Sequence, residues 1–130
     1  MKKVGTILVS FALLLSFGGC SRTKTFDVYH ARSLSIQSAD SGTMITIVDE
    51  AELEAIAMNF ASIQWKRAGK NQDSTGWSYR LCWYDENGKC MEDVTIVNNG
   101  QILWNGYLYT SKQVVINTTM LEELLYKYGV

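Results

Sequence analysis

Three Asn-Gly pairs divide the second half of this chain into short segments, and they constrain its fold more than any other feature. The pairs are Asn87-Gly88, Asn99-Gly100 and Asn105-Gly106. This dipeptide is favoured in two-residue type I′ turns, because both central residues of such a turn need a positive φ. The segments between the pairs alternate in the manner of strands. We therefore predict an antiparallel meander of four strands, at 77–86, 89–98, 101–104 and 107–110.

Two-residue turns also fix which residues lie opposite one another in each hairpin. On one face the opposite residues are apolar, in the pairs Tyr79–Ile96, Leu81–Val94, Ile96–Leu103 and Leu103–Leu108. This face has the composition expected of a face that covers a core. The other face is mixed, and one end of it is aromatic, with Tyr84, Ile102, Trp104, Tyr107 and Tyr109.

Two amphipathic helices are predicted outside the meander. Asp49 and Glu52 have the spacing of a capping box, and an apolar stripe follows at i, i+3, i+4 and i+7, formed by Leu53, Ile56, Ala57 and Phe60. Asn117, Thr118 or Thr119 caps the second helix, and Glu122 could complete a capping box from Thr119. The second stripe has the same spacing, with Leu121, Leu124, Leu125 and Tyr128.

Shorter alternating or β-branched segments predict further strands at 26–33, 44–48, 63–65 and 114–116. Two helices with one apolar face each and a sheet with one core face predict a two-layer α+β fold. We expect an antiparallel meander sheet with both helices packed on one face, in the approximate order ββαβββββα.

The first twenty residues predict export. Met1-Lys2-Lys3 is cationic, residues 4–17 are apolar, and small residues precede Cys20. The apolar run of about 14 residues is shorter than the roughly 20 that a spanning helix needs. Phe17-Gly18-Gly19-Cys20 resembles the lipobox of bacterial lipoproteins, with Phe17 where that family usually has Leu. The resemblance implies a signal peptide at 1–19, a diacylglyceryl group on Cys20 and a short tether at 20–25.

The remaining residues, 26–130, have the length of a single domain. Without Lys2 and Lys3, 10 of the 12 Lys and Arg residues remain against 13 Asp and Glu, a net charge of −3. This balance makes nucleic acid and anionic lipid poor candidate partners.

Two cysteines remain beside Cys20. The predicted register places Cys82 on the mixed face and Cys90 on the core face, so their Cβ atoms point to opposite sides of the sheet. A disulfide needs these atoms about 3.5–4.5 Å apart. We therefore predict free thiols at both positions, while a hairpin loop of odd length would place both on one face and allow a bridge.

No catalytic or metal-binding pattern is present. His30 is the only histidine and has no cysteine or second histidine at a zinc-like spacing, so we expect no metal and no cofactor. A serine triad would have to use His30, and no serine lies in a nucleophile-elbow pattern. Glu92 and Asp93 are adjacent on a strand and cannot act as a carboxylate pair; Glu92 is expected opposite Trp83 as a partly shielded acid.

The aromatic end of the mixed face is the candidate binding surface. Its members are Tyr84, Ile102, Trp104, Tyr107 and Tyr109. Trp and Tyr supply large, rigid, amphipathic contact area and are common in binding sites. The alternative is that these rings form cross-strand pairs that stabilise the sheet and are covered by the N-terminal strands of the chain itself. The sequence does not decide whether residues 26–48 cover this face.

Residues 75–79 (TGWSY), 83–89 (WYDENGK) and 104–109 (WNGYLY) resemble small lipoproteins of Gram-positive gut bacteria with a C-terminal domain of unknown function. The resemblance implies a location on the outer face of the cell membrane, with the membrane held through the lipid on Cys20. We expect a non-enzymatic binding or accessory module for an envelope protein or peptide. The alternative is an extracytoplasmic hydrolase or an inhibitor of an envelope enzyme.

Overall fold

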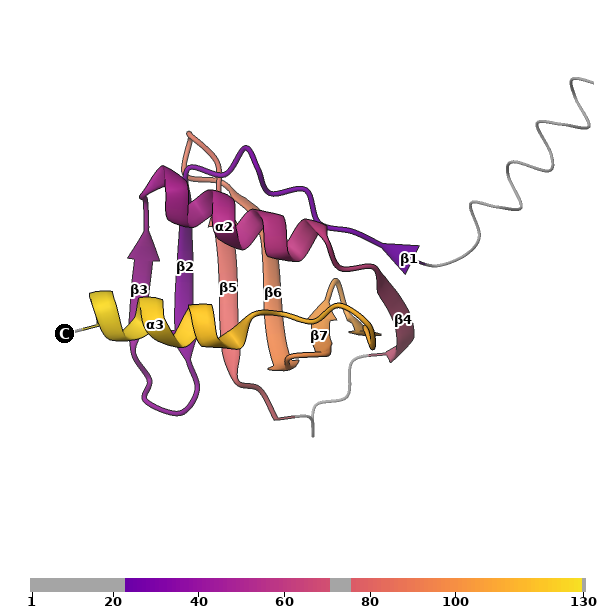
Figure 1. The fold of residues 1–130 in the computed structure, drawn as a ribbon. Helices are drawn as coiled ribbons and strands as arrows, with labels where there is room; N and C mark the ends of the chain where they lie inside the picture. The colour runs from indigo at the N-terminus through magenta and orange to yellow at the C-terminus, as the bar shows by residue number, and fades with distance from the viewer. Residues whose placement is uncertain (1–22, 71–75, 130) are drawn as a thin grey trace, which may run out of the picture.

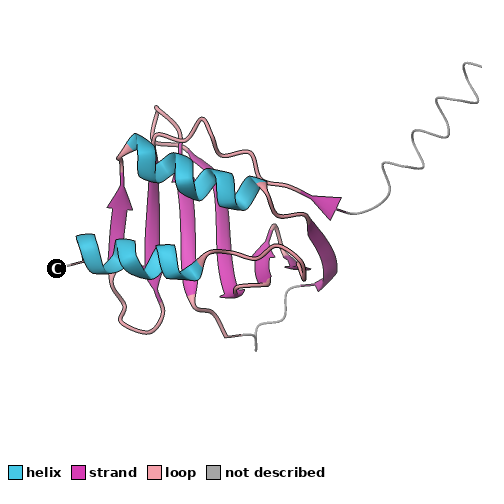
Figure 2. Ribbon diagram, in the orientation of Figure 1, coloured by secondary structure: helices cyan, strands magenta, loops and turns pink. Residues whose placement is uncertain are grey.

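Two helices lie on one face of an eight-stranded antiparallel sheet in the computed structural model, which describes residues 23–70 and 76–129 (Figure 1). The strands are β1 (Thr23–Lys24), β2 (Ser33–Ser38), β3 (Met44–Ile47), β4 (Trp65–Lys70), β5 (Tyr79–Tyr84), β6 (Cys90–Asn98), β7 (Gln101–Trp104) and β8 (Tyr107–Thr110). The helices are α2 (Glu50–Ala61) and α3 (Thr118–Tyr128). The predicted α+β class is confirmed, and Figure 2 shows both helices on the same side of the sheet.

The sheet is a meander that is extended at both ends. The strand order is β1-β4-β8-β7-β6-β5-β2-β3, in which β5 to β8 follow one another along the chain. The β2–β3 hairpin extends the meander beyond β5, and β4 followed by β1 extends it beyond β8. The element order agrees closely with the predicted one, and the two-residue strand β1 is an addition to it.

The N-terminal segment differs from the prediction. Residues 26–33 were expected to form a strand, but only Ser33 belongs to one. The strand that pairs with β5 is β2, which begins at Ser33. Phe26 and Val28 are buried while the residues after each are exposed. An irregular segment that crosses the edge of a core can bury every second residue as a strand does, so the alternation alone was misleading.

The segment at 114–116 is not a strand either. It belongs to the connection between β8 and α3. Ile116 is buried, and its N–H donates a hydrogen bond to the carbonyl oxygen of Asn99 at 2.9 Å. Ile116 therefore closes the connection onto the core, whereas Val114 and Val115 are exposed.

Helix α2 begins and packs as its pattern predicts. The carboxylate of Asp49 accepts a hydrogen bond from the N–H of Glu52 at 3.0 Å, and the four stripe residues are buried. Glu52 does not complete the capping box. Its carboxylate accepts hydrogen bonds from Lys127 Nζ at 2.8 Å and from the Tyr128 hydroxyl at 2.5 Å, which join the start of α2 to the end of α3. These contacts, that of Lys127 first, lower the pKa of Glu52.

Helix α3 is capped by Asn117, the first of the three predicted candidates. Its side chain accepts a hydrogen bond from Met120 N at 3.1 Å, and its own N–H donates to Asn59 Oδ1 of α2 at 2.8 Å. Glu122 was expected in a capping box but accepts a hydrogen bond from the Tyr79 hydroxyl of β5. Burial, followed by this hydrogen bond, raises the pKa of Tyr79 to about 12.

The three Asn-Gly pairs form three different connections. Asn105 and Gly106 have φ values of +51° and +82°, as the predicted type I′ turn requires. Asn99-Gly100 also joins its strands through two residues, but neither has a positive φ. Asn87-Gly88 belongs to a longer loop in which only the glycine, at +79°, has a positive φ.

The Asn99-Gly100 turn is accompanied by a bulge. The register shifts between Ile96 and Asn98, so Ile96 lies opposite Ile102 and not opposite Leu103. A turn without positive φ does not match the right-handed twist of the strands, and an extra residue on one strand can take up the mismatch. The predicted pairs in the β5–β6 hairpin and the Leu103–Leu108 pair are confirmed, whereas the Ile96–Leu103 pair is wrong.

This shift of one residue reverses the faces of β7 and β8. Ile102, Trp104 and Tyr109 enter the core between the sheet and the elements that cover it. Leu103 and Leu108, which were predicted to face the core, are only partly buried on the opposite face.

Candidate functional site

The candidate aromatic surface is not a surface in this structure. Ile102, Trp104 and Tyr109 are 0%, 8% and 1% exposed, and Tyr107 is partly buried against the Arg67 guanidinium, 4.1 Å from its ring centroid. Tyr84 alternates with buried Trp83 and lies on the other face of the sheet. The structure therefore does not bring the five predicted residues together, and the prediction of a joint binding surface is wrong.

Trp104 shows what covers these rings. Its ring centroid lies 4.2 Å from that of Phe26 and 5.3 Å from that of Tyr109. Phe26 belongs to the segment before β2, so the N-terminal part of the chain covers this end of the sheet. This agrees with the alternative that the N-terminal part of the chain covers these rings, although the covering segment is not a strand.

Glu92 lies opposite Trp83 as expected and is half-buried. Burial raises the pKa of its carboxyl group, while the indole N–H of Trp104 and the ammonium of Lys24 oppose this shift. The Trp104 indole nitrogen nevertheless has no hydrogen-bond partner within bonding geometry. Glu92 is therefore an acid at the rim of the aromatic core. Its carboxylate interacts electrostatically with the Trp104 N–H, but the two groups do not form a hydrogen bond.

Cys82 and Cys90 form a disulfide, with their Cα atoms 6.4 Å apart, so the prediction of free thiols is wrong. The reason is the length of the hairpin loop, together with a register shift between Trp83 and Tyr84 that leaves the predicted pairs from Tyr79–Ile96 to Trp83–Glu92 in place. The N–H of Asp85 donates to the carbonyl oxygen of Lys89 at 2.9 Å, which leaves three loop residues and places Tyr84 opposite Cys90. The odd length puts both cysteines on the face away from the helices.

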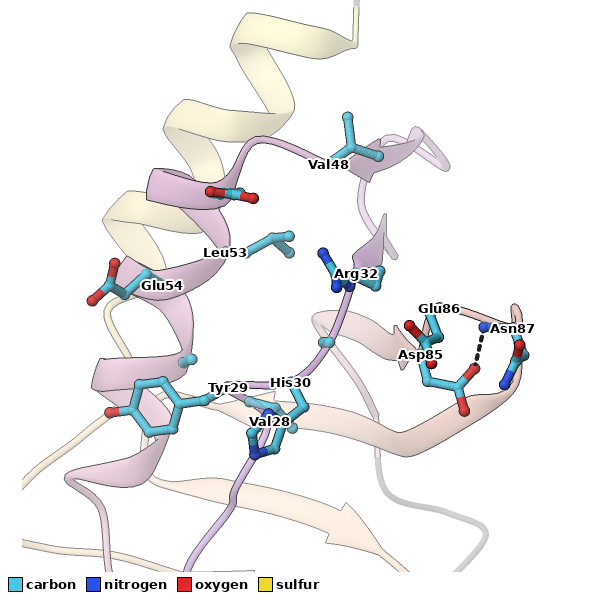
Figure 3. A pocket seen from close by; sticks show the side chains of 13 residues that line it. Val28, Tyr29, His30, Arg32, Val48, Leu53, Glu54, Asp85, Glu86 and Asn87 are labelled. Atoms are coloured by element: carbon cyan, nitrogen blue, oxygen red, sulfur yellow. Dashed lines mark hydrogen bonds between the residues drawn. The ribbon is translucent and has the colours of Figure 1, made fainter.

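An open groove of about 670 Å³ lies where three separate segments meet. One wall is the loop before β2, one is the first turns of α2 with the residue that follows β3, and one is the tip of the β5–β6 hairpin (Figure 3). The lining residues are Val28, Tyr29, His30, Ala31, Arg32, Val48, Glu50, Leu53, Glu54, Ala57, Asp85, Glu86 and Asn87.

Local interactions hold two walls of the groove in place, the loop before β2 and the hairpin tip. Arg32 N donates to the carbonyl oxygen of Tyr84 at 2.8 Å, which fixes the loop against the end of β5. The Asp85 carboxylate accepts hydrogen bonds from the N–H groups of Asn87 at 2.8 Å and Lys89 at 2.9 Å, and these shape the hairpin tip. Figure 3 shows the first of these bonds at the edge of the groove.

The groove combines an apolar floor with a charged rim. Val28, Ala31, Leu53 and Ala57 are buried and form its apolar part. Four acids, Glu50, Glu54, Asp85 and Glu86, line it together with one cation, Arg32. Carboxylates therefore outnumber cationic side chains in the lining. Tyr29, 51% exposed, adds an accessible aromatic ring.

The sequence pattern assigned His30 neither to a metal site nor to a serine triad, and it did not predict the groove. Its walls come from residues that are distant in sequence, so no local pattern indicates it. Among residues 23–70 and 76–129, no three His, Cys, Asp or Glu side chains are grouped as metal ligands. In the same ranges no helix has the length and apolar character needed to cross a bilayer. The lipidation candidate Cys20 lies outside the described residues.

Comparisons with known proteins add no relative to this description. No protein-family model, curated protein sequence or solved structure matches the chain.

Proposed function

We propose that this chain is a lipid-anchored, extracytoplasmic binding module that holds an envelope protein or peptide segment in the groove. The observation that carries the proposal is the groove itself, with its apolar floor and charged rim. Ligand sites are typically concave, about 300–1,000 Å³ in volume, and combine apolar lining with a few polar groups. The groove thus replaces the aromatic residues of the sheet as the candidate binding site.

The charge of the groove favours a cationic ligand segment. Four carboxylates face one guanidinium across its lining, so a Lys or Arg side chain of a ligand gains complementary charge. Val48, 68% exposed, and the ring of Tyr29, 51% exposed, give an adjoining aliphatic part of the same segment an apolar surface. An extended segment of mixed cationic and aliphatic residues fits both features.

The anchor in this proposal is a diacylglyceryl group on Cys20. Its support is the export signal and the lipobox-like sequence that ends at this residue. Two acyl chains on one residue hold a protein at a bilayer stably, whereas a single chain gives only marginal binding. The binding module would therefore act at the outer face of the cell membrane.

Site-specific photocrosslinking in intact cells tests the groove. A benzophenone amino acid would replace Tyr29 in the groove or, as a matched control, Tyr126 of α3, which is 84% exposed and outside the groove. We expect a discrete crosslinked species from position 29 only, and its loss when Glu54→Lys and Glu86→Lys are added. Equal crosslinking from both positions, or a position-29 product that survives the charge reversals, contradicts the assignment of the groove.

The second candidate is an extracytoplasmic hydrolase or an inhibitor of an envelope enzyme. The observation in its favour is that His30 lies in the same groove as four carboxylic acids. A hydrolase would release product from envelope peptides or glycans and lose this activity in a His30→Gln variant. A binding module would retain the crosslink at position 29 in that variant and release no product.

A further inference from the structure

The β1–β4 end of the sheet is cationic. The two strands contain Lys24, Lys66, Arg67 and Lys70, and neither contains an acid. Lys24, Lys66 and Lys70 are exposed, and Arg67 is partly buried over the ring of Tyr107. We call these four residues the cationic edge.

The acids of the groove lie elsewhere in the fold. Glu50 and Glu54 belong to the start of α2, which lies beside β3 at the opposite end of the sheet from β1 (Figure 1). Among the described residues, Glu92 is an acid whose carboxylate interacts electrostatically with Lys24 and so partly neutralises the charge of the cationic edge. Asp73 follows β4 in sequence but lies outside the described residues. Within the net charge of −3, the cations of the β1–β4 end and the acids near β3 are thus at opposite ends of the sheet.

The cationic edge is also the place where the lipid anchor must attach. Cys20 precedes Thr23, the first residue of β1, by three residues. A fully extended chain spans at most about 3.6 Å per residue, so these two positions lie within roughly 11 Å of each other in any conformation. Thr23 and Lys24, which the sequence assigned to a tether at 20–25, are paired with β4 and belong to the sheet.

We propose that the cationic edge docks on the headgroups of an anionic phospholipid bilayer. The inference rests on the proposed lipid at Cys20, which brings this edge within about one or two Debye lengths of the membrane surface. Lys and Arg residues that come to the surface from that distance are attracted to anionic headgroups, each with a bias of roughly fivefold at the surface. The sequence prediction that anionic lipid is a poor partner used the net charge, whereas a surface at this short range responds to the local charge.

Docking has a consequence for the groove. If β1 and β4 rest on the bilayer, the end of the sheet that carries β3 and the start of α2 points away from it. The groove would then be presented to the space outside the membrane, where a protein ligand can reach it. A tether alone, without docking, would leave the domain free to turn.

Lysine acetylation in nanodiscs tests the docking. The mature lipidated protein is placed in discs of phosphatidylcholine alone or with 30 mol% phosphatidylglycerol, treated with a limiting water-soluble acetylating reagent, and mapped by mass spectrometry. We expect Lys66 and Lys70 to react at least fivefold more slowly in the anionic discs, with full reactivity restored in 1 M NaCl. Lys89, at the hairpin tip, serves as the reference and should react equally in both discs.

Charge reversal supplies the second arm. In a Lys66→Glu and Lys70→Glu variant, the protection of Lys24 by anionic discs should be lost. The matched control, Arg80→Glu with Lys89→Glu, makes the same change of charge elsewhere on the sheet and should retain it. Circular dichroism confirms that both variants are folded.

Either of two results would overturn the docking: equal acetylation of Lys66 and Lys70 in both discs, or slowing of Lys89 to the same degree. The same mass spectra report the modification of Cys20. An unmodified Cys20 would refute the proposed anchor, whereas a lipidated Cys20 without protection at the cationic edge would refute the docking alone.

Discussion

Replacing Trp104 by Ala tests the bulge that decides which face of β7 is buried. Trp104 is 8% exposed and lies between the rings of Phe26 and Tyr109. A buried tryptophan removes about 200 Å² from water, which at about 25 cal/mol per Å² contributes about 5 kcal/mol. The alanine retains a small part of this contribution.

The expected cost of Trp104→Ala is therefore about 3–4 kcal/mol in the free energy of unfolding, within the range for large-to-small core substitutions. Urea denaturation followed by circular dichroism, with the disulfide intact, measures it. Trp77→Ala is the control, because Trp77 is only partly buried and its ring faces the exposed Arg80 at 4.4 Å. That change should cost less than about 1 kcal/mol.

A third variant separates packing from the unpaired nitrogen. Trp104→Phe keeps an aromatic ring against Phe26 and removes the N–H, so we expect it to cost much less than Trp104→Ala, about 1 kcal/mol. If Trp104→Ala and Trp77→Ala cost the same, Trp104 is not in the core. The register without a bulge, with Trp104 on the outer face, would then be correct.

Three further predictions concern other parts of the fold. Cys82→Ser, measured without reductant, should lower the free energy of unfolding by about 2–3 kcal/mol, as expected for a short closed loop, and an unchanged value would refute the bridge to Cys90. The pKa of Tyr79 is raised to about 12, so its contribution is complete below pH 10 and is lost as the pH rises through 12. Between pH 10 and pH 12 the free energy of unfolding of the wild-type protein should fall by about 2 kcal/mol more than that of Tyr79→Phe. Parallel pH profiles of the two proteins would contradict the burial of the hydroxyl. Gly106→Ala should cost about 1 kcal/mol because of its positive φ, while Gly69→Ala, in open space, should cost less.

The helices and the β5–β6 register could be predicted because local patterns determine them. The stripe of α2 has one buried face, and an Asp cap marks its start. The pairs Tyr79–Ile96 and Leu81–Val94 are correct because only one face of these strands is apolar enough to be buried. In such strands a slip of one residue would expose the whole apolar set.

The faces of β7 could not be predicted in this way. Residues 102–104 are Ile, Leu and Trp, so both possible faces are apolar and alternation does not select one. The dipeptide gives no help either, because Asn99-Gly100 and Asn105-Gly106 are identical in sequence and differ in φ. The bulge arises from how the turn fits the twist of the neighbouring strands, which is a property of the sheet and not of the dipeptide.

The disulfide was missed for a related reason. The loop at Asn87-Gly88 was given two residues, whereas the Asp85 carboxylate binds two backbone N–H groups and closes a loop of three. Aspartate before an Asn-Gly pair was a usable signal, since Asp side chains commonly bond to backbone N–H groups two residues on. The groove had no comparable signal, because its three walls meet only through the topology of the sheet.

The mass of the native mature protein tests the central claim most directly. If this chain is a lipid-anchored module, its mature form begins at Cys20 and carries a diacylglyceryl group on the sulfur of that residue. Mass spectrometry of the protein from isolated membranes should show this modified terminus. An intact Met1, or a mature chain that begins after Cys20 and has no fatty acid, would contradict the anchor and with it the docking of the cationic edge.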